Sequence, residues 1–240
     1  MHQHFCTCSS KECPHHPLNQ ASSCDACIQK NLTLGEIPAC FWTNAKRIAG
    51  TTEYSAFKFA KYVLKNQLYH ELAKHLPEYT IQHITNDNYE CFFDIHKSNE
   101  AFFQLTEGRP ASLKDFESDL NNVPDGFHMD DMDYVGIKLK EQHIAILSYL
   151  KGFPDQDIVW LGLLLVHGEY HGTGYGSTIL NAFEQSAIIC GYKIVQLGVV
   201  SSNQPAIAYW EKQGYQVNRV TEDHKIIVYE KELRLECVET

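Results

Sequence analysis

The stretch that decides the fold is Ile158–Ala187, which reads IVWLGLLLVHGEYHGTGYGSTILNAFEQSA. Its first part, Ile158–Val166, is an apolar run that is too short to span a bilayer and is typical of a central strand. From Ile179 onward, apolar residues recur at the 3.6-residue period of an amphipathic helix. We therefore predict a buried strand, a glycine-rich turn and a helix that stops at Gly191.

The turn between this strand and this helix has the chemistry of a phosphate-binding loop. Glycines let the main chain approach a ligand closely, and the N–H groups at a helix start lie at its positive end. The loop lacks the lysine of a P-loop and the glycine spacing of a dinucleotide-binding turn, and a glycine-rich turn without a ligand is the alternative. The residues that we expect to face the ligand are His171, Gly172, Thr173, Gly174, Tyr175, Gly176 and Ser177.

A second motif follows, and the two motifs together resemble those of one family. The first stretch resembles motif A of the GNAT acetyltransferases, Gln/Arg-x-x-Gly-x-Gly/Ala, with His171 in the Gln/Arg place. The segment Asn203–Tyr215, NQPAIAYWEKQGY, is similar to the family's N-x-x-A-x-x-x-Y-x-k-x-G-F. The resemblance implies an α/β fold of the α+β type. Its mixed central sheet would have about six or seven strands and flanking helices, with strands 158–166 and 193–200 splayed apart.

The same resemblance implies a cofactor site and a reaction. The gap between the splayed strands would hold the pantetheine arm of acetyl-CoA, paired with the main chain of Leu164, Leu165 and Val166. One face of the helix after Asn203, carrying Ala206 and Trp210, would look at the thiol. The implied activity is direct transfer of acetyl, in a ternary complex, to an unidentified primary amine of a small molecule or peptide.

The chain departs from the family where the catalytic groups are expected. Trp210 stands at the place of the tyrosine that often protonates the leaving thiolate, and an indole N–H has no usable acidity. Tyr209 is one residue away, about 100° round the helix, and we expect it to face away. No carboxylate lies inside the central strand, so the candidate bases include Asp157 and His167. A non-catalytic acyl-CoA-binding or metal- or redox-sensing protein with a degenerate GNAT domain is the alternative.

Composition limits the partners and the compartment. The net charge of −10 argues against nucleic acid and mildly favours cationic amine substrates, although acidity can also serve solubility alone. There is no secretory signal and no apolar stretch of 18 residues, so we expect no membrane contact, a cytoplasmic location and reduced thiols.

The N-terminal segment is rich in cysteine. Six of the nine cysteines fall within the first 40 residues, and they include a C-x-C and a C-x-x-C. Such thiolate pairs suit tetrahedral zinc, while disulfides, an iron–sulfur cluster and a metal-free or redox-sensing tail are alternatives. The segment 5–42 also resembles a small bacterial cysteine-rich domain of unknown function. The candidate metal ligands are Cys6, Cys8, Cys13, His16, Cys24, Cys27 and Cys40.

These patterns predict a three-part organisation. Residues 1–45 form the cysteine-rich module, 46–77 a connecting helix and 78–240 the acetyltransferase domain. The apolar stripe of the connecting helix, from Phe57 to Leu76, indicates packing on its own chain or a homodimer contact. By the resemblance, two helices at Asn88–Lys97 and Leu113–Asn121 and their loop line the acceptor side of the cleft. Asn99, Phe102, Phe103 and Arg109 would then touch substrate.

The metal prediction is tested by elemental analysis. Protein purified under reducing conditions is expected to carry about one zinc or more per chain, because structural zinc binds tightly. A content below about 0.3 zinc per chain would contradict a structural site.

Overall fold

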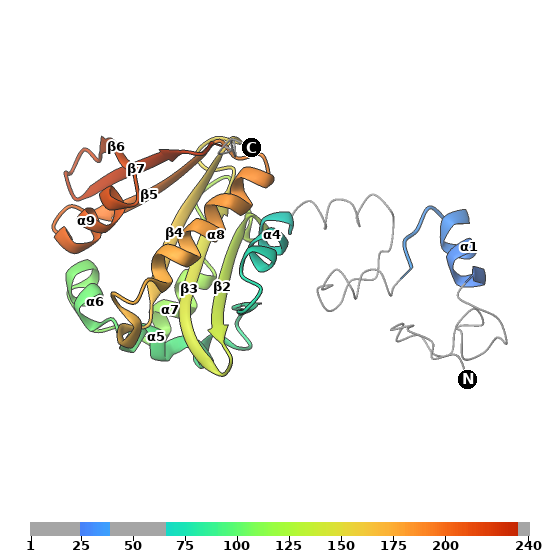
Figure 1. Ribbon diagram of the computed structural model, residues 1–240, viewed down its shortest axis with the longest axis horizontal. Helices are drawn as coiled ribbons and strands as arrows, with labels where there is room; N and C mark the ends of the chain where they lie inside the picture. The colour runs from blue at the N-terminus through green and yellow to red at the C-terminus, as the bar shows by residue number, and fades with distance from the viewer. Residues whose placement is uncertain (1–24, 39–65, 235–240) are drawn as a thin grey trace, which may run out of the picture. The chain divides into compact units, whose positions relative to one another are not determined.

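The computed structural model describes residues 25–38 and 66–234 (Figure 1). Contacts divide the chain into two compact units, Met1–Gln67 and Leu68–Thr240, and each is described by itself. The described part of the first unit holds one helix, α1 (Asp25–Thr33). Cys27 lies in this helix, and the other six candidate metal ligands lie outside the described residues, so the zinc site stays a prediction.

A seven-stranded mixed sheet forms the second unit, in the order β1-β2-β3-β4-β5-β7-β6. Its neighbours are antiparallel except for β4 and β5, which run parallel. This confirms the expected mixed sheet of six or seven strands. The strands are β1 (Thr80–His83), β2 (Met132–Leu139), β3 (Gln142–Lys151), β4 (Ile158–Val166), β5 (Ile194–Val200), β6 (Gln216–Val220) and β7 (Ile226–Glu232).

Helices cover both faces of this sheet. The α-helices of the unit are α4 (Gln67–His75), α5 (Phe93–Lys97), α6 (Glu100–Glu107), α7 (Leu113–Leu120), α8 (Tyr175–Ile189) and α9 (Gln204–Lys212). Short 3₁₀ turns occur at η1 (Tyr89–Phe92), η2 (Met129–Asp131) and η3 (Gly168–Tyr170). Within the described residues, none of the helices is long and apolar enough to cross a membrane.

The alternation of side chains along the strands builds two apolar clusters, one on each face. In β3, Ala145 and Leu147 join the cluster under α4, α8 and α9, whereas Ile146 joins the cluster of α5 and α7. Figure 1 shows α8 lying across the face formed by β3 and β4. The glycine-rich turn that precedes α8 is therefore fixed at one end of the central strand.

One helical segment differs from the expectation, and another agrees with it over the part that the structure describes. The segment expected to be a turn-rich loop between the acceptor-side helices contains α6, which ends at Gly108 in a left-handed conformation with φ 69°. Of the expected connecting helix, the structure describes only the C-terminal end. There Leu68 and Leu72 of α4 are buried in the core of the second unit, which agrees with a stripe packed on its own chain.

His96 of α5 is a buried base that makes stability depend on pH. It is 2% exposed, its ring centroid lies 4.0 Å from that of Phe116 and 5.2 Å from that of Phe103, and its Nδ1 has no hydrogen-bond partner among the described residues. Burial lowers the pKa of His96 from 6.5 to about 4. Between pH 6.5 and about pH 4, the unfolded chain therefore binds a proton on His96 that the folded chain does not bind.

We predict that the His96 contribution is fully present above pH 6.5 and is lost as the pH falls toward 4. Between pH 7.5 and 4.5 this amounts to roughly 2–3 kcal/mol of the free energy of unfolding. In urea unfolding, His96→Phe should lose less stability over this range than the wild type, whereas the exposed His128→Phe should behave like the wild type. Equal pH dependence in all three proteins would contradict the prediction.

Candidate active site

The central strands part midway along their length. β4 and β5 pair at four positions, from Ile158 with Ile194 to Leu161 with Leu197. Beyond Leu161 no further pair joins the two strands in the described region, although β4 continues to Val166. Figure 1 shows β5 and β7 turning away from β4. The expected splay is therefore present, and it opens toward the carboxyl ends of both strands.

A β-bulge in β4 marks the point of separation. Tyr149 of β3 pairs with Leu161 and Ser148 pairs with Leu163, so Gly162 has no partner in β3. A Cβ atom at Gly162 would lie 2.9 Å from the Ser148 Oγ. A bulge bends a strand and increases its twist, which turns the end of β4 out of the line of β5.

The edge of β4 beyond the bulge presents main-chain groups to the gap. The His167 N–H donates to the Ile144 carbonyl at 2.8 Å, so the alternation of the ladder directs the N–H and C=O of Leu165 to β3. The same alternation directs the N–H and C=O groups of Leu164 and Val166 away from β3 and toward the gap. Two of the three expected pantetheine-pairing residues therefore expose their main chain there.

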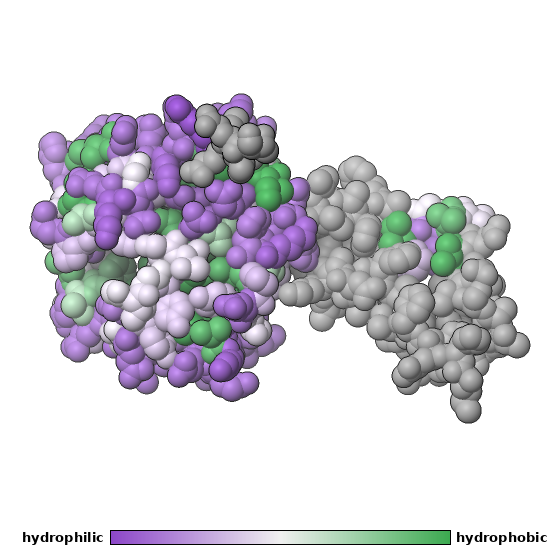
Figure 2. Space-filling model, viewed as in Figure 1, coloured by the Kyte–Doolittle hydropathy of each residue, from purple (hydrophilic) through white to green (hydrophobic). Residues whose placement is uncertain are grey.

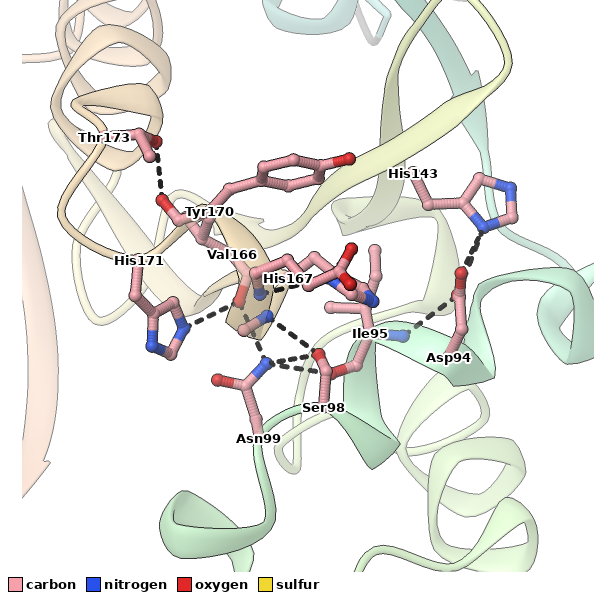
Figure 3. A network of polar contacts seen from close by, with 12 residues as sticks. Asp94, Ile95, Ser98, Asn99, His143, Val166, His167, Tyr170, His171 and Thr173 are labelled. Carbon is pink, nitrogen blue, oxygen red and sulfur yellow. Dashed lines mark hydrogen bonds and ion pairs between the residues drawn. The ribbon is translucent and has the colours of Figure 1, made fainter.

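One of these groups already has partners. The Val166 carbonyl accepts a hydrogen bond from the Asn99 Nδ2 at 2.9 Å and another from the His171 Nε2 at 3.0 Å (Figure 3). A carbonyl oxygen has two lone pairs, so both are used. The Leu164 N–H and C=O and the Val166 N–H are the groups left for a ligand in the gap.

The N-terminus of α8 lies at the same end of β4. Gly174 is its N-cap with φ 96°, and its carbonyl accepts from the Thr178 N–H at 3.0 Å. No side chain of the described residues caps this end, so the N–H groups of Tyr175, Gly176 and Ser177 lie in the unpaired first turn. This arrangement favours an anionic ligand at the loop that the sequence analysis identified.

The helix that follows β5 turns Tyr209, not Trp210, toward this loop. Trp210 is 9% exposed and packs in the core, with its ring centroid 5.2 Å from that of Tyr215. A Cβ atom at Gly176 would lie 3.2 Å from the Tyr209 hydroxyl. The expected orientation of these two side chains is therefore reversed, because the chain after α9 turns back at Gly214 and packs Tyr215 against the indole.

The Tyr209 hydroxyl remains a proton donor. Burial raises the pKa of Tyr209, the neighbouring Ser177 hydroxyl opposes that rise, and the Glu184 carboxylate adds to it. Ser177 in turn accepts a hydrogen bond from the Gln213 Nε2 at 3.1 Å. The Asn203 side chain caps α9 by accepting from the Ala206 N–H at 3.2 Å, as predicted for the capping role.

The structure separates the two candidate bases. Asp157 precedes β4 and pairs with Lys193, so it lies at the opposite end of the strand from the gap, roughly 25–30 Å from Val166. It is therefore too far away to act on a substrate in the gap. His167 directly follows β4, and its Nδ1 accepts from the Glu169 N–H at 3.3 Å.

Two further polar residues, Asp94 and Ser98, lie at this end of the sheet, and no sequence pattern predicted them. Asp94 of α5 pairs with the His143 Nδ1 of β3 at 2.9 Å, and the Ser98 hydroxyl accepts from the Gly168 N–H at 2.9 Å (Figure 3). These partners are 49 and 70 residues apart in the chain, so no local pattern joins them. Of the residues expected to contact substrate, Arg109 forms an ion pair with Asp115.

The molecular surface is hollowed beside the splayed strands. Figure 2 shows a hollow with apolar residues in it, between the places that Figure 1 gives to α6 and α9. Its position agrees with a cleft between the acceptor-side helices and the C-terminal strands.

Comparison with known proteins identifies the family. A family model described as "Acetyltransferase (GNAT) family" matches residues 84–215, which is more than half of the chain. The chain therefore belongs to the GNAT acetyltransferase family, and it is an N-acetyltransferase. A second model, a domain of unknown function named DUF6485, matches residues 1–68 and confirms the resemblance of the cysteine-rich segment, which extends beyond residue 42.

Solved structures share the fold. An acetyltransferase from Thermus thermophilus superimposes with a TM-score of 0.55 at 20% identity, over 65% of this chain and 97% of that chain. A spermidine N-acetyltransferase from Vibrio cholerae, in complex with CoA and spermine, gives 0.51 at 13% identity, over 65% and 96%. No protein with a curated description matches the chain.

The glycine at the start of α8 gives a direct test of the loop. Gly174→Val should weaken coenzyme A binding at least tenfold in calorimetry, because a side chain at φ 96° strains the turn that carries the N–H groups. Gly191→Val is the matched control, since Gly191 ends the same helix with φ 87° and an equally open surrounding. The control should change affinity less than about twofold. Equal affinities for wild type and both variants would show that the loop does not hold the coenzyme.

Proposed function

We propose that this protein transfers acetyl from acetyl-CoA to a primary amine within a ternary complex. The observation that carries the proposal is the end of the β4–β5 ladder at Leu161, beside the uncapped first turn of α8. A pantetheine arm carries amides that can pair with the free edge of β4, and a pyrophosphate suits the N–H groups at a helix start. Both features lie at the same end of the central strand.

The reaction requires one bond to form and one to break. The neutral amine nitrogen attacks the thioester carbonyl carbon, a C–N bond forms, the C–S bond breaks, and the nitrogen loses a proton. The N–H of Leu164 or Val166 faces the gap and would stabilise the developing oxyanion. A water molecule would take the proton from the amine, or the His167 Nδ1 would take it after releasing the Glu169 N–H.

Tyr209 is the proposed donor to the departing thiolate. Its hydroxyl is buried beside Gly176 and Ser177 without a hydrogen-bond partner among the described residues, and the adjacent Trp210 ring packs in the core. A tyrosine hydroxyl is protonated at neutral pH, and burial raises the pKa of Tyr209 further, so the hydroxyl is present as a hydrogen-bond donor to the departing thiolate. The role that the family resemblance would give to a tyrosine at position 210 is thus proposed for the adjacent residue.

The charge of the acceptor side favours a cationic amine. Residues 89–131, which include α5, α6 and α7, carry ten carboxylates and three lysine or arginine side chains, a net −7 of the chain's −10. Burial raises the pKa of Asp119, and the carboxylates of Glu107 and Asp115 raise it further, as expected where negative charges crowd together. Such a surface raises the local concentration of cationic substrates. Polyamines and peptides with a basic N-terminus are therefore the first acceptors to assay.

We further propose that zinc holds the cysteine-rich module together. Its thiolates and His16 are ligands of the type that tetrahedral zinc prefers. Among the described residues no group of three or more His, Cys, Asp or Glu could hold a metal ion, and the proposed ligand set lies almost entirely outside them.

The enzymatic proposal is tested by turnover on a panel of amines. Release of the coenzyme A thiol is measured with butylamine, spermidine and peptides that begin with Ala or Lys, at low and high salt. We expect turnover to favour the cationic acceptors and to fall as salt screens the acidic helices. Coenzyme A binding without turnover on any amine would instead support a coenzyme-binding protein that does not catalyse transfer.

Substitutions in α9 separate the two aromatic residues. Tyr209→Phe should lower kcat at least tenfold, because it removes the donor but keeps the ring. Trp210→Phe should keep kcat within a few-fold while it lowers the free energy of unfolding by about 1–3 kcal/mol, because it leaves a core cavity. The reverse pattern, with kcat lost only in Trp210→Phe, would contradict the proposed roles.

A further inference from the structure

Asn99 occupies a helix N-cap but does not cap the helix. It precedes α6 as the N-cap residue, and its side chain makes no cap hydrogen bond. The side chain is 6% exposed, and its Nδ2 donates instead to the Ile95 carbonyl at 2.8 Å and to the Val166 carbonyl at 2.9 Å. Asparagine is among the best capping residues, so α6 gives up a favourable interaction. A local preference that is overridden in this way points to a requirement elsewhere in the molecule.

At the end of β4, the Val166 carbonyl requires a hydrogen-bond donor, and Asn99 supplies one. The Val166 carbonyl faces the side from which β5 has departed, and a buried carbonyl needs a donor. Asn99 and His171 supply two donors, while the N–H of the same peptide unit, that of His167, donates to the Ile144 carbonyl at 2.8 Å. The peptide between residues 166 and 167 is therefore held at both its oxygen and its nitrogen.

Ser98, the residue before Asn99, forms a second link between α5 and the segment that follows β4. Its hydroxyl donates to the Ile95 carbonyl at 2.8 Å and accepts from the Gly168 N–H at 2.9 Å. A Cβ atom at Gly168 would collide with the Ser98 carbonyl oxygen, so the two main chains approach closely only because residue 168 is glycine. Figure 3 shows Ser98 and Asn99 together beneath the segment that follows β4.

We propose that Ser98, Asn99 and His171 form a clamp on the end of β4 that positions its free edge for the pantetheine arm. We call this set the β4 clamp. The clamp fixes the peptide that follows Val166, and so holds the end of the strand whose preceding peptide carries the Val166 N–H that faces the gap. It also ties the corner between α5 and α6, on the acceptor side, to the strand on the coenzyme side. These are positioning residues, and their role rests on the proposed function.

The two halves of coenzyme A distinguish positioning from general stability. Adenosine 3′-phosphate 5′-diphosphate has the pyrophosphate but no pantetheine, so it needs the loop of α8 and not the edge of β4. In calorimetry, Asn99→Ala should weaken coenzyme A binding about tenfold and should weaken binding of this fragment less than twofold. Ser112→Ala is the control, because Ser112 is a true N-cap, of α7, and has no contact with β4 in the described structure. It should destabilise the protein and leave both affinities unchanged.

A second pair of variants covers the case in which Asn99→Ala does not fold. Ser98 is only half-buried, and Ser98→Ala removes no more than its hydroxyl, so this substitution leaves the core intact. Ser98→Ala should show the same selective loss for coenzyme A, because the Gly168 N–H loses its acceptor, and Ser98→Thr, which keeps a hydroxyl, should restore part of it. If the variants lost affinity equally for coenzyme A and for the fragment, or for neither, the clamp would be overturned. The proposed function would still stand in that case, provided that the wild type binds coenzyme A. Failure of the wild type to bind coenzyme A would overturn both.

Discussion

After Leu161, one edge of β4 has no strand to pair with in the described part of the chain. An unpaired N–H or C=O that is buried is costly, so a strand edge inside a protein needs another partner. Here the protein supplies partners to one group, the Val166 carbonyl, and leaves the neighbouring groups of Leu164 and Val166 facing the gap. The bulge at Gly162 lies where this ladder ends, and the proposed coenzyme site depends on the main-chain groups that the incomplete ladder leaves free.

The rest of the site is arranged around the end of that strand. The chain leaves β4, makes a 3₁₀ turn and enters α8 through Gly174, which brings a positive helix end to the gap. On the other side, the corner between α5 and α6 is bonded to the same residues. A coenzyme and an acceptor that met in the gap would therefore be held by elements fixed to one short segment, residues 166–168. This explains how helices distant in sequence can act on the geometry of one reaction.

The sequence predicts the fold well because its signals are local. An apolar run, glycines before an amphipathic helix and a capped helix after the second splayed strand are each readable over a few residues, and each lies where it was expected. α6 was missed because Ser98 and Asn99 before it and Gly108 and Pro110 after it are typical turn residues. The orientations of Tyr209 and Trp210 could not be deduced from helical spacing alone, since core packing against Tyr215 decides which ring is buried. The partners of Val166 come from 67 residues before it and 5 after it, so only the folded chain shows them.

Residue-resolved hydrogen exchange tests the incomplete ladder most directly. In the free protein, the amides of Leu164 and Val166 should exchange quickly, while Leu163 and Leu165, which pair with β3, should be protected. Addition of coenzyme A should slow exchange at Leu164, Val166 and the first turn of α8, and should leave the hairpin of β2 and β3 unchanged. If the coenzyme protected none of these amides, or if Leu164 and Val166 were already as protected as Leu165 without it, the gap would not be the coenzyme site.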